Sequence, residues 1–284
     1  MPTIKFTKMH GAGNDYIYVN AMAYPIADPQ KEAVVWSDRH KGIGSDGLIL
    51  IDHSDKADFK MRMFNNDGSE GIMCGNGIRC VGKYVYDHRL TTSKIITIET
   101  LGGIKTLQLY TDSNNMVEKA RVDMGIPSLT NPTQFAIGNG AGLKADISAI
   151  DARGTRHTYQ GIFVCMGNPH FVIFVDDITK IDLTADGQAL EVHPVFPQKC
   201  NIEFAQLRAD GSIRTRVWER GTGITQACGT GACATATAAI LTGLATDRVT
   251  IAMDGGDLNI EWDGKGHLFM TGPATTVFEG EISL

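Results

Sequence analysis

The chain has 284 residues and a mass of 30.7 kDa, which is enough for one large domain or two ordinary ones, and we expect two. The net charge of −6 and the pI near 5.7 argue against nucleic acid or an anionic membrane as the main partner, because both reward a concentrated basic patch. The first residues show no basic segment followed by an apolar run, so no signal peptide is expected, and no run approaches the roughly 20 apolar residues of a membrane span. These features favour a cytoplasmic protein with a small-molecule partner.

Cysteine and histidine spacing argues against a metal site. The six cysteines form no C-x-x-C pair, so free thiols in a reducing compartment are expected, and the eight histidines form no H-E-x-x-H motif. Pyridoxal phosphate would need a phosphate-binding glycine loop, for which Gly11-Ala12-Gly13 is a weak candidate. The sequence therefore predicts no metal and no cofactor.

The first half of the chain is predicted to be mixed α/β. Asp28-Pro29 has the pattern of a helix start, and this helix is expected to run to about Arg39. A second helix is expected over 77–88, and strands are predicted at 48–52, 59–64 and 95–100.

The second half alternates in the same way. Strands are predicted at 161–166, 170–175, 201–206, 213–219, 248–253 and 258–262. They surround a helix over 231–244 whose residues are small and apolar on every side, which is typical of a buried helix. A last strand is predicted over 276–284.

An internal repeat relates the two halves at an offset of 154 residues. Cys74-Gly75-Asn76-Gly77 falls on Cys228-Gly229-Thr230-Gly231, and Gly13-Asn14 falls on Gly167-Asn168. Between them, Phe64 falls on Trp218 without a gap. We therefore expect an α/β (α+β) fold of two pseudo-symmetric domains. Each would be a curved, mostly antiparallel sheet or a barrel around a central buried helix, with the active site in the interdomain cleft.

The two matched cysteines are the candidate catalytic residues. A cysteine at a helix start lies beside unpaired N–H groups and the positive end of the helix dipole, which stabilise a thiolate. A single cysteine is more often an inert buried residue, and that interpretation is kept for Cys80, Cys165, Cys200 and Cys233. Cys74 and Cys228 differ because both occupy equivalent points of the repeat.

Two such loops predict proton transfer at an amino-acid carbon. Helix N-termini bind carboxylates, and donors aimed at a carboxylate stabilise the enolate-like state that forms when the α-proton leaves. One thiolate would remove that proton and the opposite thiol would return one, which inverts the carbon.

Longer motifs resemble the diaminopimelate epimerase family from the first strand to the last. The motifs are 10–15 (HGAGND), 39–46 (RHKGIGSD), 64–70 (FNNDGSE), 73–80 (MCGNGIRC), 167–170 (GNPH), 201–204 (NIEF), 218–221 (WERG) and 227–232 (ACGTGA). The resemblance implies a PLP-independent isomerase of lysine and peptidoglycan precursor biosynthesis that interconverts LL-2,6-diaminopimelate and the meso form, with Cys74 and Cys228 as bases. It also implies a homodimer.

The resemblance also implies roles for other residues. Those matching the binding set of the distal, unreactive end are Asn14, Asn65, Asn168, Asn201 and Arg220. Those matching the cradle of the reacting carboxylate are Gly75, Asn76, Gly229 and Thr230. Glu219 matches a residue that reads the distal ammonium and supports the second cysteine, and His170 matches an auxiliary to the thiols. The alternatives stay open: the asparagines and glycines as turn residues, Glu219 as a solvated strand end, and His170 as a core histidine.

The sequence departs from the family pattern at two positions, and two alternative functions are retained. Gly47 stands where many members have glutamine, and Ile224 where many have glutamate. The family implies domains over 1–120 with 273–284, carrying Cys74, and over 121–272, carrying Cys228. The alternatives are a related proline or hydroxyproline racemase, which also uses paired cysteines, and a non-catalytic amino-acid binding protein.

Overall fold

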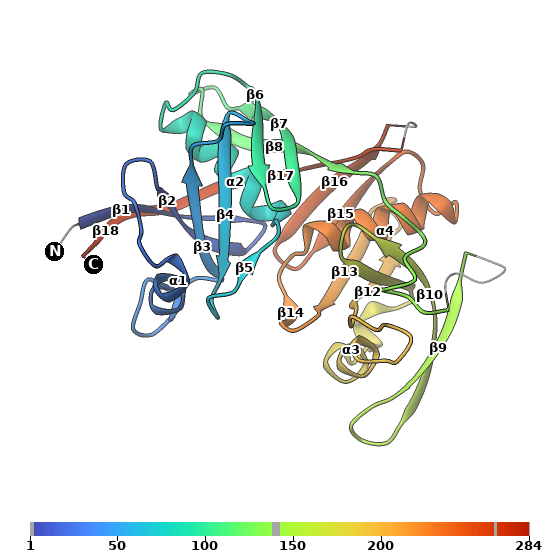
Figure 1. The fold of residues 1–284 in the computed structure, drawn as a ribbon. Coiled ribbons are helices and arrows are strands. Elements are labelled where there is room, and N and C mark those ends of the chain that lie inside the picture. Colours follow the sequence, from blue (N-terminus) through green and yellow to red (C-terminus); the bar gives the residue numbers. More distant parts are fainter. Residues whose placement is uncertain (1–2, 138–142, 264–265, 284) are drawn as a thin grey trace. The chain divides into compact units, whose positions relative to one another are not determined.

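A computed structural model describes residues 3–137, 143–263 and 266–283. The chain forms two compact units (Figure 1): unit 1 comprises Met1–Asp123 and Thr271–Leu284, and unit 2 comprises Met124–Met270. That these units act as the two epimerase domains, with boundaries after residues 120 and 272, stays a prediction. Within the described residues, no helix is long and apolar enough to cross a membrane.

Unit 1 is a sheet with two helices. Its strands lie in the order β18-β1-β2-β3-β4-β6-β7-β8, with β2–β3 and β4–β6 parallel and the other neighbours antiparallel. Its elements are β1 (Thr3–Gly11), β2 (Asn14–Asn20), α1 (Pro29–Ser37), β3 (Gly47–Asp52), β4 (Phe59–Asn65), β5 (Glu70–Gly71), α2 (Gly75–Asp87), β6 (Ile95–Thr100), β7 (Gly103–Thr111), β8 (Val117–Gly125) and β18 (Thr275–Ser283).

Unit 2 repeats this plan with the strand order β9-β10-β11-β12-β13-β15-β16. Its elements are β9 (Ala145–Ile150), β10 (Arg156–Cys165), β11 (Pro169–Phe174), the 3-10 helix η1 (Ile178–Lys180), α3 (Leu183–Glu191), β12 (Asn201–Leu207), β13 (Ile213–Glu219), β14 (Gly223–Thr225), α4 (Gly229–Leu241), β15 (Arg248–Met253), β16 (Gly256–Trp262) and β17 (Leu268–Pro273), whose last residues enter unit 1.

The repeat predicted at offset 154 is present in the topology of both units. Strands β10 to β16 pair in the same order and directions as β1 to β7, with parallel pairs at β11–β12 and β13–β15. The bounds of β13 and α4 are those of β4 and α2 moved by 154 residues. One architecture has therefore been used twice, and equivalent positions of the two units can be compared directly.

Side-chain alternation in the third strand of each repeat separates two packing layers. Leu48 and Leu50 of β3 join the core cluster beneath α1, whereas Ile49 points the other way, toward α2. In β12, Ile202 joins the cluster on the α3 side, and Glu203 points toward α4. Each cysteine-bearing helix therefore rests on a strand whose central inward residue is Ile49 in unit 1 and Glu203 in unit 2.

The predicted fold class is confirmed, with two refinements. The prediction left open a curved sheet or a barrel; among the pairings of described residues neither sheet closes on itself, so the curved sheet is correct. Helix α4 is buried along most of its length, as its composition predicts, whereas α2 keeps a partly exposed edge at Lys83, Tyr86 and Asp87. Both helices begin two residues earlier than expected, at Gly75 and Gly229.

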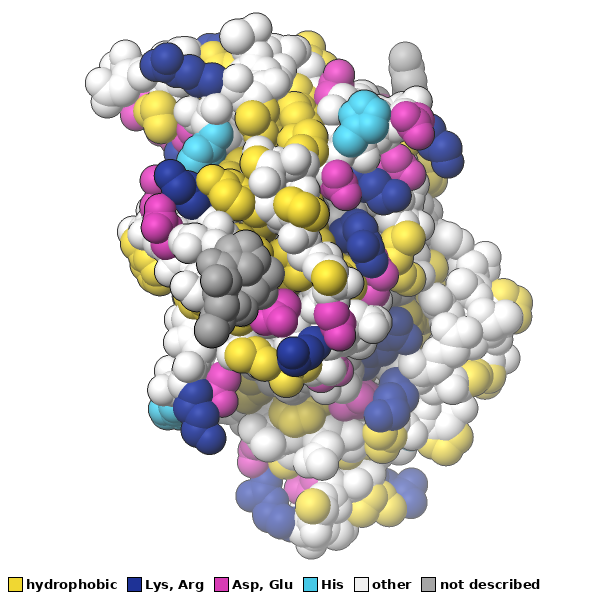
Figure 2. Space-filling view, turned by 60° about the vertical axis from the view of Figure 1, so that its left-hand side comes forward, with side chains coloured by type: hydrophobic (Ala, Val, Ile, Leu, Met, Phe, Trp, Pro, Cys, Tyr) yellow, Lys and Arg dark blue, Asp and Glu magenta, His cyan; other side chains and the backbone are white. Residues whose placement is uncertain are grey.

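Charge of both signs is mixed on the surface. On the face drawn in Figure 2, lysines and arginines alternate with aspartates and glutamates among the described residues, and that face has no concentrated basic patch. This mixture accords with the net charge of −6.

Candidate functional site

The two candidate cysteines occupy the same structural position in their units. Cys74 is the N-cap of α2 with φ −122° and ψ 117°, and Cys228 is the N-cap of α4 with φ −119° and ψ 113°. Each Sγ accepts the N–H of the third helical residue, from Gly77 at 3.2 Å and from Gly231 at 3.4 Å. A sulfur thus takes the place of the usual capping oxygen, and negative charge on it would lie at the positive end of a helix.

Asn14 is a side-chain hydrogen-bond partner of the first cysteine. A tight turn, with positive φ at Ala12 and Gly13, joins β1 to β2 and places Asn14 at the start of β2. Its Oδ1 accepts the Cys74 thiol at 3.2 Å. The segment Gly11-Ala12-Gly13 is therefore a hairpin connection.

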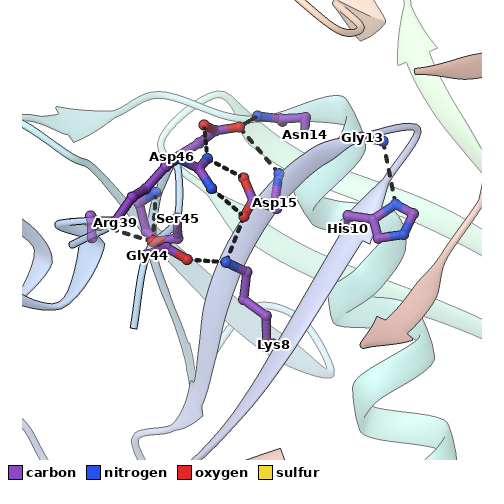
Figure 3. Close-up of polar contacts among 11 residues, drawn as sticks. Lys8, His10, Gly13, Asn14, Asp15, Arg39, Gly44, Ser45 and Asp46 are labelled. Atoms are coloured by element: carbon purple, nitrogen blue, oxygen red, sulfur yellow. Dashed lines mark hydrogen bonds and ion pairs between the residues drawn. The ribbon is translucent and has the colours of Figure 1, made fainter. Parts of the chain in front are cut away.

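A cluster of charged side chains holds Asn14 (Figure 3). Asn14 Nδ2 donates to Asp46 at 2.7 Å, and Arg39 bridges Asp46 and Asp15 at 2.9 and 2.7 Å. Lys8, which is nearly buried, pairs with Asp15 at 2.5 Å and also donates to the Gly44 carbonyl. The contacts leave the Asn14 carbonyl oxygen turned toward Cys74.

The two carboxyls of this cluster are shifted in opposite directions. Burial alone would raise the pKa of Asp15, but hydrogen bonds from Arg39 and Lys8 outweigh it and lower that pKa. Burial and the neighbouring charge of Asp15 raise the pKa of Asp46. Asp15 is the main anion of the cluster, and Asp46 is the acceptor for Asn14.

The second cysteine lies at the end of a row of hydrogen-bonded side chains in unit 2. Cys228 Sγ lies 3.5 Å from Thr230 Oγ1, which accepts from Asn168 Nδ2 at 3.3 Å. Asn168 Oδ1 lies 3.1 Å from His170 Nε2, and His170 Nδ1 lies 2.7 Å from Glu203 Oε1. His170 and Glu203 have no exposed side-chain surface, so His170 is buried, and its polar partners show that it is more than a packing residue.

Glu219 and the burial of Cys228 determine the electrostatics of this half. Burial, followed by the charges of Glu219 and Glu203, raises the pKa of Cys228 well above its usual value. Burial also raises the pKa of Glu219, which accepts a hydrogen bond from Thr225. Burial and the two carboxylates thus oppose the stabilisation of a thiolate by the helix start and favour the protonated form of Cys228.

The residues predicted to bind the distal end of the substrate fall into separate groups. Asn201 donates to the Pro169 carbonyl at 2.8 Å and accepts the backbone N–H of Arg220 at 3.0 Å, so these two predicted residues lie together. The Arg220 guanidinium donates to the Gln198 carbonyl at 2.9 Å. Asn65, at the end of β4 in unit 1, donates to Ser69 at 3.0 Å.

The predicted carboxylate cradles are the first turns of α2 and α4. Gly75 and Gly229 are the first helical residues and are buried. Asn76 is also buried, and its side chain accepts from Arg79 at 3.0 Å, so only its backbone is suited to the predicted role. Thr230 is partly buried and belongs to the row at Cys228.

The two departures from the family pattern have different surroundings. A Cβ at Gly47 would collide with the Phe64 carbonyl and lie 2.9 Å from Tyr16 Cε1, so this packing accepts only glycine. Ile224 is 43% exposed at the centre of the short strand β14 and has room for other side chains. The first departure is thus linked to the packing of a side chain beside Cys74.

Sequence reasoning missed Glu203, Tyr16 and the charged cluster. Glu203 could have been found from the repeat, because it falls on Ile49 at the same offset of 154 and is an acidic residue between the apolar Ile202 and Phe204. The cluster had no comparable signal, since Lys8, Asp15 and Arg39 come from separate segments. Within residues 3–137, 143–263 and 266–283, no group of three or more His, Cys, Asp or Glu is arranged to hold a metal ion.

Sequence comparison relates the chain to one family over nearly its whole length. The family model described as diaminopimelate epimerase matches residues 6–130 and 162–277. A diaminopimelate epimerase of Phocaeicola vulgatus is 58% identical over 99% of each chain, and one of Bacteroides thetaiotaomicron is 56% identical over 98% of each. A Methanococcus maripaludis protein of the same name is 51% identical.

Solved structures share the fold at much lower identity. A PhzF-family phenazine biosynthesis protein of Bacillus anthracis aligns over all of both chains with a TM-score of 0.72 and 16% identity. A hydroxyproline epimerase of Agrobacterium vitis aligns over 99% of this chain and 93% of its own with a TM-score of 0.70 and 14% identity. At these identities the likeness shows the two-domain fold alone.

Proposed function

The chain belongs to the diaminopimelate epimerase family and is therefore an isomerase, and we propose that it interconverts LL-2,6-diaminopimelate and meso-diaminopimelate without a cofactor. Cys74 and Cys228 are the two bases in this proposal. The observation that carries it is the equivalence of the two cysteines: each is the N-cap of a 13-residue helix, with backbone angles within a few degrees of its counterpart.

The proposed reaction moves one proton off the α-carbon and another onto it. A thiolate removes the α-proton from one face, the electron pair delocalises into the carboxylate, and the second thiol donates its proton from the other face. The first N–H groups of α2 and α4 supply donors for the carboxylate, whose negative charge grows in the transition state. Because burial keeps Cys228 protonated, we assign it the role of proton donor at rest.

The distal end of the substrate requires its own binding residues. Arg220 is suited to a carboxylate because a guanidinium can donate two parallel hydrogen bonds. Its backbone N–H is held by Asn201, and its guanidinium donates to the Gln198 carbonyl within the part of the chain that the structure describes. We propose that Arg220, with Asn65, Asn168 and Asn201, holds this end, and that Asn14 acts mainly at Cys74.

Solvent-isotope incorporation tests this proposal. Reduced protein is incubated with LL-diaminopimelate in deuterated water, and both α-deuterium and the meso isomer are measured. Wild type is expected to form both, and Cys74→Ala and Cys228→Ala are expected to lose about 10²–10⁴-fold in epimerisation, as removal of an acid–base group does. Cys80→Ala and Cys233→Ala, on the same two helices, are the matched controls and should keep wild-type rates.

Two outcomes would contradict the proposal. Wild-type turnover of proline or hydroxyproline in place of diaminopimelate, with full activity in Arg220→Met, would favour a proline-type racemase. Tight binding of diaminopimelate without exchange or isomerisation would favour a non-catalytic binding protein. We also propose, from the family resemblance, a cytoplasmic homodimer, which sedimentation of the purified protein would test.

A further inference from the structure

We infer that Glu203 is a positioning residue for the second cysteine: it holds His170 so that the donors of the row His170–Asn168–Thr230 point toward Cys228. The inference concerns the same reaction and rests on the proposed function of Cys228 as a base. Glu203 lies behind His170, which separates it from Asn168 and Thr230, and acts through these side chains.

Both ring nitrogens of His170 face oxygens. Nδ1 lies 2.7 Å from Glu203 Oε1, and Nε2 lies 3.1 Å from Asn168 Oδ1. Donation from both nitrogens satisfies both oxygens, and the buried Nδ1 needs an acceptor on its side of the ring. Glu203 supplies that acceptor.

The remaining hydrogen bonds of the row run in one direction, toward Cys228. With Asn168 Oδ1 accepting from the ring, its Nδ2 donates to Thr230 Oγ1 at 3.3 Å. The Thr230 hydroxyl is then free to donate to Cys228 Sγ at 3.5 Å, together with the Gly231 N–H at 3.4 Å. All donors of the row point at the sulfur, which suits a thiolate.

The equivalent position in unit 1 argues against a purely structural role for the pair. A Cβ added at Gly231 would lie 2.7 Å from Glu203 Oε1, and a Cβ added at the equivalent Gly77 would lie 2.7 Å from Ile49 Cδ1. Unit 1 therefore fills the same space beneath its cysteine-bearing helix with a hydrocarbon side chain. Burying a carboxylate there costs free energy that an isoleucine would not, and Glu203 Oε2 has no hydrogen-bond partner among the described residues. The fold does not need the charge, so we assign it to the chemistry at Cys228.

Several ionisable groups face this site, and they oppose one another. Two carboxyls raise the pKa of Cys228 directly by their charge, Glu219 from β13 and Glu203 from β12. Cys200, which precedes β12, is itself affected by the charges of Glu203 and Arg220. A direct effect of Glu203 on Cys228 and an effect through His170 thus have opposite signs, which makes them separable.

The experiment is alkylation of Cys228 by iodoacetamide as a function of pH, read by peptide mass spectrometry in the full-length reduced protein. In Glu203→Gln the ring loses its carboxylate, Asn168 must turn, and Thr230 no longer donates to the sulfur. The half-maximal pH of Cys228 alkylation is expected to rise by about half a pH unit or more, which is roughly a threefold slower reaction at neutral pH. Cys74 in the same sample is the internal control and should not shift.

The variants His170→Asn and Glu203→Gln/His170→Asn complete a double-mutant cycle. The double variant carries no unpaired buried charge, so it is the control for variants in which such a charge disturbs folding. Once His170 is absent, Glu203→Gln should add no further upward shift. A downward shift in Glu203→Gln would show that Glu203 acts only by its direct charge, and no shift would show that it does not act on Cys228; either result overturns the inference. Asp186→Asn, a buried carboxyl that faces His157 elsewhere in unit 2, is the matched control variant.

This readout does not depend on turnover. If wild type fails to epimerise diaminopimelate, the proposed function is wrong even when the alkylation shift appears. If wild type epimerises normally and the shift is absent or reversed, only the role of Glu203 is wrong.

Discussion

The two cysteines have nearly identical backbones and contrasting surroundings. Beneath Cys74, at repeat-equivalent positions, lie Tyr16 and Ile49; beneath Cys228 lie His170 and Glu203. Burial raises the pKa of Tyr16 well above its usual value, so its phenol stays neutral. In the first half-site, Cys74 and its neighbours in unit 1, the two described residues at these positions are thus a neutral phenol and a hydrocarbon. The second, Cys228 and its neighbours in unit 2, has an ionisable pair there.

In the first half-site, the charged side chains instead lie beside Asn14, which contacts Cys74. Asp46 and Asp15, with Arg39 and Lys8, are connected to Cys74 through Asn14. The position in unit 2 that falls on Asp46 is Cys200, so unit 2 has no copy of that cluster. A repeated fold has therefore kept its helix caps and diverged in the side chains that surround the two cysteines.

The strongest test of the difference between the half-sites is to place the side chains found beneath Cys74 beneath Cys228. The double variant His170→Tyr/Glu203→Ile gives the second half-site the pair found beneath Cys74. If the ionisable pair is needed only at Cys228, kcat should fall by about 100-fold, the lower range for loss of acid–base assistance, while KM changes little. Steady-state kinetics with both isomers measure this.

Folding of the transplant needs its own control. Because Ile49 and Tyr16 already occupy these positions in unit 1, the substituted pair is compatible with the architecture, and the thermal midpoint should stay close to that of wild type. A folded transplant with wild-type kcat would remove the proposed difference between the half-sites.

The sequence predicted the repeat and the helix caps because both are local. The offset of 154 is visible in Cys74-Gly75 and Cys228-Gly229, and the composition of 231–244 predicts a buried helix without any tertiary information. The partner of His170 could not be predicted in the same way. Glu203 lies 33 residues away, and its contact with the ring depends on the parallel pairing of β11 with β12.

A smaller effect is expected from loosening Asn14. In Asp46→Asn the acceptor of Asn14 Nδ2 becomes a neutral amide, and Arg39 keeps only Asp15. A hydrogen bond to a charged group contributes about 1.5–3 kcal/mol, but Asp46 is 40% exposed and solvent screens part of this, so about a tenfold loss of kcat is expected.

Alkylation can show which half-site the Asp46 variant affects. The rate at Cys74 should change and the rate at Cys228 should not. Asp55→Asn, on a side chain that is 94% exposed, is the control and should match wild type. Equal changes at both cysteines would mean that Asp46 acts on the whole protein and not through Asn14.

The two helix-start glycines distinguish the half-sites by stability. In Gly77→Ala the new methyl meets the end of Ile49, which can rotate away, whereas in Gly231→Ala it meets Glu203 Oε1, which His170 holds at 2.7 Å. Overpacking costs about 1–3 kcal/mol, so Gly231→Ala should approach that cost and Gly77→Ala should fall below it. Denaturant unfolding of both variants measures the difference, and a larger loss for Gly77→Ala would contradict the rigid placement of Glu203.

The smallest effect concerns Cys80, whose thiol has no counterpart at the equivalent position of α4. Cys80 in α2 falls on Ala234 in α4, and burial raises the pKa of this fully buried thiol from 9.0 to about 11. The folded chain therefore keeps the proton up to about pH 11, whereas the unfolded chain loses it near pH 9. The stabilisation is complete below pH 9 and disappears as the pH rises through 11, and two pKa units correspond to about 2–3 kcal/mol.

Cys80→Ala should lose a little stability at pH 7.5 through the missing sulfur, and this deficit should shrink or reverse at pH 10.5. The raised pKa values of Cys200 and Cys228 are common to both proteins and cancel in that difference. An equal deficit at both pH values would mean that the environment of α2 does not hold the Cys80 thiol in its neutral form.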